Sequence, residues 1–335
     1  MSMTAKELAK LLNLSEAAIS MALNNKPGVS TATRQRVLAA AREHGYDFSK
    51  LKDSSEPKAE EGTISLLIYR KHGAVVSDTP FFSQLTEGIE QGCRKAHYRL
   101  YINYLYGDSN IKKQLTQLPY CNGILLLATE MKLEDFEPFH SLGVPLVVLD
   151  TWYENLGYDS ILINNFQGAY QAASYLIGKT KSQAGYLRSS YSIGNFNERA
   201  DGFYKAIREN GMSASRSPVL CLSPSMEGAY KDMLELLENG EKPCRSYFAD
   251  NDLIAAGAMK ALKEKGYRIP EDVALIGFDD MPLCTYVEPA LTTVHVPKQY
   301  MGQMAVTRLL QIIKGSDAYP VKIEIGTNIV KRKSV

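Results

Sequence analysis

The sequence predicts an α/β protein with a small all-helical head and two doubly wound α/β subdomains, and three observations support this. Residues 1–48 carry apolar residues at helical spacing. Residues 49–62, SKLKDSSEPKAEEG, are almost entirely polar and charged, as in a solvated linker. From residue 63 onward, short β-branched runs alternate with longer amphipathic segments, which predicts βαβ units and parallel sheets.

Composition narrows the class of protein. The 335 residues suggest two or three domains, and 45% apolar with 22% charged residues is typical of a globular chain. Net charge is +1, but residues 1–52 hold eight Lys or Arg against four Asp or Glu. A basic head on a slightly acidic body hints at a polyanionic partner.

The cysteines indicate whether the protein binds a metal, and the first residues indicate where in the cell it works. Five widely spaced cysteines without a CxxC pair predict reduced thiols rather than a metal site or a disulfide framework. We expect no cofactor. The first residues, MSMTAKELAKLL, lack a signal-peptide core, and no apolar run is long enough for a membrane span. A cytoplasmic protein without a membrane partner is therefore expected.

The head divides into three helices. Thr4 can cap the first, with Glu7 three residues later completing a capping box, and Ser15 can cap the second. The break NKPGVS precedes a third helix that starts at Ser30 or Thr31. The inward faces are expected to hold Leu8, Leu11, Leu12, Ala18, Ile19, Leu23, Val37, Leu38 and Ala41. This pattern predicts a helix-turn-helix whose second helix enters a DNA major groove, and a three-helix bundle used for packing is the alternative.

The body continues the strand and helix alternation to its end. Strands are expected at 63–69, 99–104, 123–128, 145–150, 160–165, 184–189, 246–250 and 273–280. Helices are expected at 81–96, 111–118, 167–179, 197–211, 228–240, 252–266 and 297–315. We expect one subdomain at about 63–156 plus 295–320 and the other at about 157–294 plus 321–330. A ligand would bind where the strand C-terminal ends of both subdomains meet.

Several segments of the chain resemble one known protein family. Residues 4–46 resemble the head of the lac repressor (LacI/GalR) family of bacterial transcription regulators. They read TAKELAKLLNLSEAAISMALNNKPGVSTATRQRVLAAAREHGY. Four segments of the body are similar to the family's recurrent tracts: DTPFFSQLTEGIEQGC, NERADGFYKAI, FADNDLIAAGAMKALKEKGYRIPEDVALIGFDD and EPALTTVHVPKQYMG. The resemblance spans nearly the whole chain and implies a helix-turn-helix regulator with a body like periplasmic sugar-binding proteins.

The resemblance implies a set of DNA-contacting residues and some departures from the family. The set is Thr4, Ser15, Glu16, Ala17, Ser20, Met21, Asn24, Ser30, Thr33, Arg34 and Tyr46. Met21 stands where the family often has a guanine-reading Arg, and Ala17 also offers only apolar contact, for instance to a thymine methyl. Glu16 can accept from a cytosine amino group or repel phosphate. The half-site should therefore differ from the family's commonest operator.

The linker departs further. The family linker forms a hinge helix on DNA and inserts a Leu in the minor groove, but here Ser55 stands at the wedge position and Lys52 at a small-residue position. Several acids nearby would oppose phosphates, and Leu51 is the only candidate wedge. We expect a looser tether that forms no kinking hinge helix.

The resemblance also implies an effector site. Its residues are Phe81, Phe82, Asp150, Trp152, Asn197, Arg199, Asn251 and Asp279. Arg supplies a planar fork of donors, and Asp and Asn supply acceptors suited to vicinal hydroxyls, whereas the aromatic rings can stack on a sugar ring or a base. The structural alternatives are core packing for the aromatics, an ion pair for Arg199 and a turn cap for Asp279.

Together these inferences predict a homodimeric repressor that binds a near-palindromic operator in double-stranded DNA. A small-molecule effector, a sugar or sugar derivative, would control operator affinity by allostery. The alternative is a cytoplasmic solute-binding sensor whose head binds a protein or binds DNA nonspecifically. An enzyme is not expected, because the sequence holds no G-x-S-x-G, P-loop or metal cluster.

Overall fold

The computed structural model describes residues 3–24, 26, 28–47, 61–71, 73, 75–76, 80–315 and 319–335. The chain separates into two compact units, Met1–Glu60 and Glu61–Val335. Of the expected linker, 49–62, only Glu61 and Gly62 lie within the described residues, and Gly62 already begins the first strand. Among the described residues, no helix combines the length and apolar character needed to cross a bilayer.

The N-terminal unit contains three helices, α1 (Ala5–Leu12), α2 (Glu16–Leu23) and α3 (Thr31–Glu43). The Thr4 hydroxyl accepts from the Glu7 backbone N–H, and the Glu7 carboxylate accepts from the Thr4 N–H, so the capping box is confirmed. The Ser15 and Ser30 hydroxyls cap α2 and α3 by accepting from the backbone N–H groups of Ala18 and Thr33. The fully buried core residues are Leu8, Ile19, Val37 and Ala41. Leu11, which the sequence also predicts to face inward, is 50% exposed, because it lies at the edge of the face that Leu8 and Leu12 bury.

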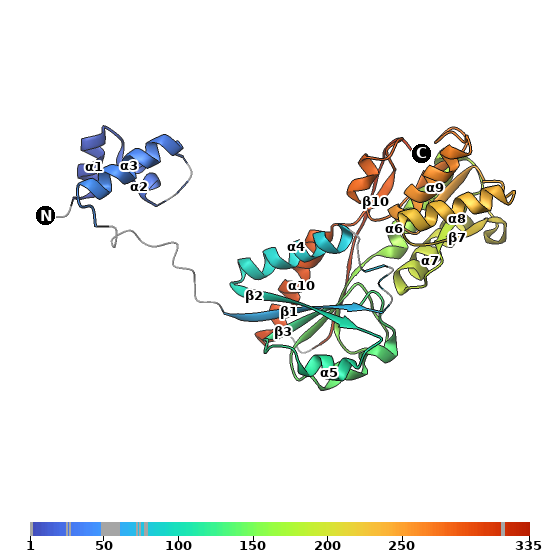
Figure 1. Ribbon diagram of the computed structural model, residues 1–335, viewed down its shortest axis with the longest axis horizontal. Helices are drawn as coiled ribbons and strands as arrows, with labels where there is room; N and C mark the ends of the chain where they lie inside the picture. Colours follow the sequence, from blue (N-terminus) through green and yellow to red (C-terminus); the bar gives the residue numbers. More distant parts are fainter. Residues whose placement is uncertain are drawn as a thin grey trace. The chain divides into compact units, whose positions relative to one another are not determined.

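The larger unit is built on two parallel sheets (Figure 1). The six-stranded sheet has the order β11-β5-β4-β3-β1-β2, the four-stranded sheet β7-β6-β8-β9, and β10 pairs with β12 in a small antiparallel ladder. The strands are β1 (Gly62–Arg70), β2 (Tyr98–Tyr106), β3 (Gly123–Leu127), β4 (Leu146–Leu149), β5 (Asp159–Ile163), β6 (Gly185–Ser189), β7 (Val219–Leu222), β8 (Ser246–Ala249), β9 (Ala274–Ile276), β10 (Thr293–His295), β11 (Lys322–Ile325) and β12 (Asn328–Val330).

Helices cover these sheets, as the strand alternation predicts. They are α4 (Pro80–Lys95), α5 (Ile111–Thr116), α6 (Asn165–Thr180), α7 (Gly194–Glu209), α8 (Met226–Glu238), α9 (Asp252–Glu264) and α10 (Lys298–Ile313), with 3-10 turns η2 (Leu133–Ser141), η3 (Ala214–Arg216) and η4 (Pro282–Thr285). Alternate β1 residues face opposite sides of the first sheet. Leu66 packs in the core with α4 and α10, whereas Leu67 packs in the core with α5 and η2. In the second lobe, α6 packs on α7 and α8 on α9.

The boundary between the two lobes differs from the expected one. The sequence predicts a second subdomain that begins near residue 157 and includes 321–330, but β5 and β11 both belong to the six-stranded sheet. β5 pairs in parallel with β4, and β11 pairs with β5, so the first sheet is completed before the chain leaves it. The alternation of strands and helices does not reveal which sheet a strand joins. The chain crosses between lobes at 163–165, 296–298 and 325–328.

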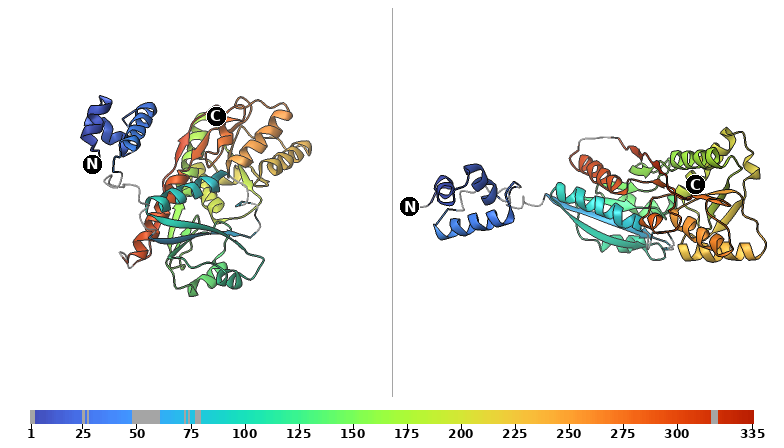
Figure 2. Two further views of the ribbon diagram at one scale, coloured as in Figure 1. Left: turned by 60° about the vertical axis from the view of Figure 1, so that its left-hand side comes forward. Right: turned by 90° about the horizontal axis from the view of Figure 1, so that it is seen from above.

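Helices α4 and α10 lie side by side on the first sheet (Figures 1 and 2). A glycine on each helix permits the close approach. A Cβ on Gly88 of α4 would overlap the carbonyl oxygen of Gln299, and one on Gly302 of α10 would overlap that of Leu85. The two helices are therefore in backbone contact, with no room for a side chain at either crossing point.

We expect Gly302→Ala to lower the free energy of unfolding by about 1–3 kcal/mol, because the added methyl group forces α4 and α10 apart. Gly178→Ala is the matched control, since a Cβ at this exposed α6 position meets no atom within 4 Å. The control should stabilise the chain by about 0.5–1 kcal/mol through helix propensity. Urea unfolding monitored by circular dichroism measures both, and equal effects would contradict close helix packing at Gly302.

A buried carboxylate holds the segment that follows β9. Asp252, the first residue of α9, is 0% exposed. One of its oxygens accepts from the Met281 backbone N–H at 2.8 Å, and the other accepts from the Thr293 hydroxyl at 2.5 Å. Burial raises the pKa of Asp252 to about 7. These bonds fix the turn that contains Asp279 and Asp280.

This pKa predicts a pH dependence of stability. Folded Asp252 keeps a proton that the unfolded chain releases near pH 4, so its contribution is full below pH 4 and is lost as pH rises through about 7. Asp252→Asn should therefore reduce the fall in unfolding free energy between pH 5 and pH 8 by on the order of 2 kcal/mol. Urea titrations at both pH values test this, with Asp201→Asn, an exposed α7 acid, as control. An unchanged fall in the Asp252 variant would refute it.

Candidate functional site

A cleft lies where the C-terminal ends of strands from both lobes meet. It is narrow: of about 350 Å³ between its walls and at its open mouth, only about 30 Å³ is wide enough for a water molecule. It is lined by Val75, Phe81, Phe82, Thr129, Asp150, Ile163, Ile193, Asn195, Phe196, Arg199, Asn251 and Asp279. Thr129, Asp150 and Ile163 follow or end β3, β4 and β5 of one lobe, whereas Asn251 and Asp279 follow β8 and β9 of the other. Ligand sites of doubly wound proteins occur at this edge of the sheet.

Most of the expected effector residues meet in this cleft. Phe81, Phe82, Asp150, Arg199, Asn251 and Asp279 line it. Asn197 does not, because it lies on the exposed side of α7, and Asn195, one helical turn before Arg199, lines the cleft in its place. Trp152 is also outside the lining. Its ring lies 4.0 Å from the Lys322 ammonium, at the edge of the first sheet.

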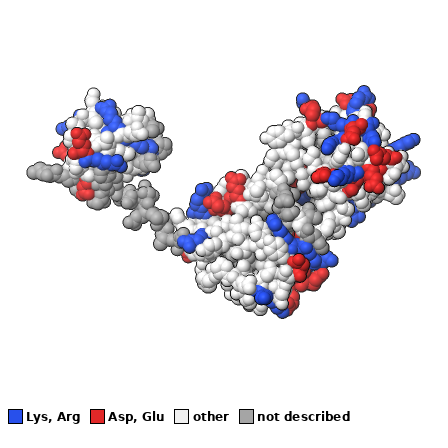
Figure 3. All heavy atoms as spheres, viewed as in Figure 1, with Lys and Arg blue, Asp and Glu red and all other residues white. Residues whose placement is uncertain are grey.

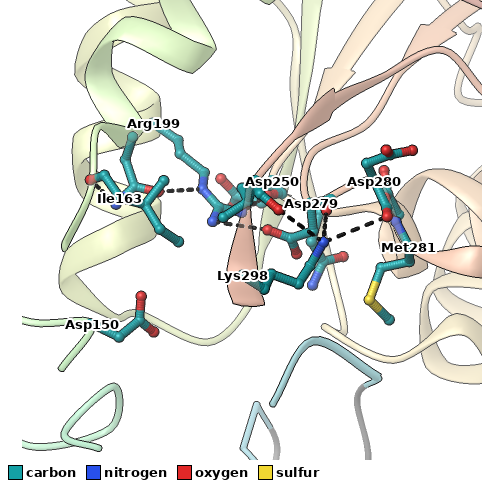
Figure 4. A network of polar contacts seen from close by, with 12 residues as sticks. Asp150, Ile163, Arg199, Asp250, Asp279, Asp280, Met281 and Lys298 are labelled. Atoms are coloured by element: carbon teal, nitrogen blue, oxygen red, sulfur yellow. Dashed lines mark hydrogen bonds and ion pairs between the residues drawn. The ribbon is translucent and has the colours of Figure 1, made fainter. Parts of the chain in front are cut away.

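Arg199 is the central cation of the cleft, and it is 3% exposed. Its Nε donates to Asn165 Oδ1 at 2.9 Å, and one terminal nitrogen donates to the Asp250 carbonyl oxygen. The other terminal nitrogen forms an ion pair with Asp279 Oδ1 at 3.2 Å (Figure 4). The guanidinium also lies 3.8 Å from the Phe278 ring centroid, in cation–π range. Arg199 thus forms a structural ion pair and also lines the cleft.

Asp150 lies on the opposite lobe from Arg199. Its Oδ2 accepts from the Thr129 hydroxyl at 2.6 Å. Burial raises the pKa of Asp150 to about 6, although the Arg199 charge favours its ionised form. Asp150 and Asp279 both have positive φ angles, 65° and 109°. Non-glycine residues hold such angles only where the surrounding structure enforces them, and this occurs often at functional sites.

A second layer of buried groups supports the Arg199 pair. The Asp250 carboxylate accepts from the Tyr186 hydroxyl and, at 2.6 Å, from the Ser189 N–H. The Lys298 ammonium, at the start of α10, donates to the carbonyl oxygens of Asp279, Asp280 and Val296 (Figure 4). Because Lys298 belongs to the 296–298 crossing, it joins the Asp279 turn to the first lobe.

Sequence reasoning missed Glu130, which organises the loop after β1. Its buried carboxylate accepts from the backbone N–H groups of Lys71, Gly73, Val75 and Val76 at 2.9–3.2 Å. This loop brings Val75 to the cleft. The only sequence signal is an acid that follows a fully apolar strand by three residues.

In the head, the expected DNA-contacting residues differ in their exposure and in the hydrogen bonds they form. Glu16, Ala17 and Ser20 form an exposed face of α2, and Met21 is half-buried beside Gly28.

Asn24 donates to the Ser20 carbonyl oxygen, and Arg34 donates to that of Lys26. Thr4, Ser15 and Ser30 are exposed caps, and Thr33 and Tyr46 are half-buried. On the visible face of the head, basic and acidic side chains are intermixed (Figure 3).

Comparisons with known proteins agree with this geometry. Residues 4–48 match bacterial regulatory proteins of the lacI family, and residues 173–335 match a periplasmic binding protein-like domain. The chain is 30% identical to the HTH-type transcriptional repressor PurR of Mannheimia succiniciproducens and 30% identical to the ribose operon repressor of Haemophilus influenzae. Each alignment covers 99% of this chain and 98% of the relative.

Among solved structures, a LacI family transcriptional regulator from Enterococcus faecium with bound ribose is similar, with a TM-score of 0.71 and 26% identity. That match covers 81% of this chain and 98% of the other. Proteins of this family bind operator DNA and small-molecule effectors and are not enzymes. The chain belongs to the lacI family of bacterial regulatory proteins and is a DNA-binding transcriptional repressor with an effector-binding unit.

Proposed function

We propose that this repressor acts in the cytoplasm as a homodimer whose operator affinity is set by a carbohydrate bound in the interlobe cleft. Helix α2 of each copy would enter the major groove of one half-site of a near-palindromic operator. The main support for the proposal is that one cleft is lined by groups from both lobes. Arg199 and Asp279 line it on one lobe, and Asp150 and Phe82 line it on the other.

The cleft chemistry favours a carbohydrate. Asp150, Asp279 and Asn251 offer acceptors for hydroxyl groups. Phe81 and Phe82 meet edge to face with centroids 5.0 Å apart, and they provide the apolar surface on which the C–H face of a sugar can pack. The similar regulator from Enterococcus faecium contains bound ribose, which supports this ligand class.

Ligand binding in the cleft would change operator affinity by changing how far the two lobes close. Groups of both lobes line the cleft, so a ligand that touches both stabilises one degree of closure over another. A coupling of about 1–3 kcal/mol is enough for useful switching of operator affinity. The acidic linker, 49–62, would tether the heads without a kinking hinge helix, by the sequence argument given above.

The decisive experiment selects binding sites from randomised DNA with the full-length protein at near-physiological salt, with residues 62–335 as the head-deleted control. We expect a palindrome of about 14–20 base pairs that the control does not enrich. Ribose or cellobiose, added to the selected operator complex, should shift its affinity. A loose tether predicts no requirement for a flexible central step.

Other outcomes of this selection are informative. No enriched motif, with or without sugars, would favour the sensor whose head binds a protein or binds DNA nonspecifically. A palindrome that demands a central pyrimidine–purine step would contradict the loose tether and implicate Leu51 as a wedge.

The recognition helix yields a separate prediction. We expect Met21→Arg to introduce a guanine preference at one position of each half-site, worth about 1–3 kcal/mol against other bases, because Arg bonds guanine in a bidentate way. Ala39→Arg, on the exposed face of α3, adds the same charge as the matched control. It should change affinity without changing the selected bases. If both variants select the unchanged motif, α2 does not read bases at residue 21.

A further inference from the structure

A groove lies between the C-terminal ends of α4 and α10, at the opposite end of α4 from the interlobe cleft. The two helices run in parallel and still touch at Gly92, where an added Cβ would overlap Val306. Toward their ends they border open space. About 690 Å³ of this groove is wide enough for a water molecule, against about 30 Å³ of the cleft. The groove therefore has the room of an ordinary ligand pocket.

The groove is lined by three cations, and none of its described lining residues is an acid. The cations are Arg94 and Lys95, in the last turn of α4, and Lys314, which caps the end of α10. Neither lysine forms an ion pair with any residue that the structure describes. Arg94 reaches Glu90, one turn earlier, at 3.7 Å in an exposed pair, and such pairs are weak in water. The positive charge of the groove is thus largely uncompensated.

Basic side chains at the end of a helix also have a structural role, because they offset the negative end of the helix dipole. This role explains the sign of the charges, but it does not explain the open space that they surround. Helix α6 provides a comparison within the chain. Lys179 and Lys181 lie at its C-terminal end in the same way, yet they border neither the groove nor the cleft.

Amide groups add further hydrogen-bond donors. Gln311 Oε1 accepts from Nη1 of the buried Arg308 at 3.2 Å, which leaves the Gln311 NH2 group for a ligand. Gln303 donates to Gln91 Oε1 at 3.0 Å and so joins the two walls of the groove. Val306 supplies part of an apolar floor. Guanidinium, ammonium and amide N–H groups are all donors to phosphate or carboxylate oxygens.

We propose that this groove binds a small organic anion with at least two negative charges, of the class of phosphorylated metabolites, and that it is a second ligand site apart from the interlobe cleft. Several charges are required because the two ammonium groups are exposed and hydrated, so that each contact in water is weak. Arg94 can hold a phosphate with its planar fork, whereas Lys95 and Lys314 act as point charges.

The position of the groove gives such a ligand a possible influence on the head. Ala96 lines the groove, and the carbonyl oxygen of the next residue, His97, accepts from the Glu61 N–H at 2.9 Å. Glu61 belongs to the last residues of the linker. A bound anion would therefore lie within a few residues of the point where the linker joins the effector unit.

The test is isothermal titration calorimetry of the full-length protein with glucose 1,6-bisphosphate and with pyrophosphate, in a phosphate-free buffer. We expect both anions to bind and their affinity to fall as KCl is raised from about 50 to about 300 mM. The double variant Lys95→Gln/Lys314→Gln should weaken binding about tenfold or more, because two charged donors are lost. The matched control, Lys179→Gln/Lys181→Gln, removes the same charge from the end of α6 and should change affinity less than about twofold.

Hydrogen exchange of the unmodified chain supplies a readout of place. Glucose 1,6-bisphosphate should slow the exchange of backbone amides at residues 91–97 and 310–315, where the two helices end. Circular dichroism verifies the fold of each variant. Anions that bind only to the basic head would leave these amides unchanged and would bind both double variants equally.

Several outcomes would overturn the proposal. These are equal anion affinity in the two double variants, no measurable binding up to about 5 mM, and protection confined to the cleft or the head. Equal affinity for glucose and its bisphosphate would refute the requirement for charge. If Lys95→Gln/Lys314→Gln binds anions normally but dissociates into monomers in light scattering, the groove is a contact between copies. None of these results decides the proposed function, because a sugar in the cleft meets none of the groove residues.

Discussion

The geometry of the cleft depends on the way Arg199 is held. One guanidinium joins the start of α6 through Asn165, the end of β8 through the Asp250 carbonyl and the turn after β9 through Asp279. Each of these three points is more than 30 residues from Arg199 in sequence, and Arg199 brings them together at one edge of the four-stranded sheet. Its burial is tolerated because the ion pair, two further hydrogen bonds and an aromatic face replace water. The same side chain therefore shapes the lobe and forms the cleft wall.

Local sequence patterns predicted most of the fold. The caps at Thr4, Ser15 and Ser30 depend on residues three positions away, and local spacing reveals such signals reliably. The limits of most strands and helices follow from periodicity in the same way. The membership of β11 in the first sheet could not be predicted, because its pairing with β5, some 160 residues earlier in the chain, leaves no periodic trace.

For the site, the resemblance supplied most positions and the local geometry corrected the rest. The same pattern that identified Arg199 suggested Asn197, but helical phase puts residues 195 and 199 on one face and turns residue 197 outward. Glu130 gave no usable signal, since an acid after a strand is common and its four backbone partners are distant in sequence. Such a role emerges only when the loop after β1 has folded over it.

The glycine contact between α4 and α10 has a mechanical consequence. Helix α4 (Pro80–Lys95) has Phe81 in its first turn at the cleft and, at 1.5 Å per residue, is about 24 Å long. Just beyond its end, the His97 carbonyl accepts from the Glu61 N–H, where the chain enters the effector unit from the head. Backbone contact at Gly88 and Gly302 leaves no side chain between the two helices at this crossing, so α4 cannot shift towards α10 there without displacing it. A displacement of α4 at the phenylalanine end would therefore carry α10 with it and would reach the residues at which the linker ends.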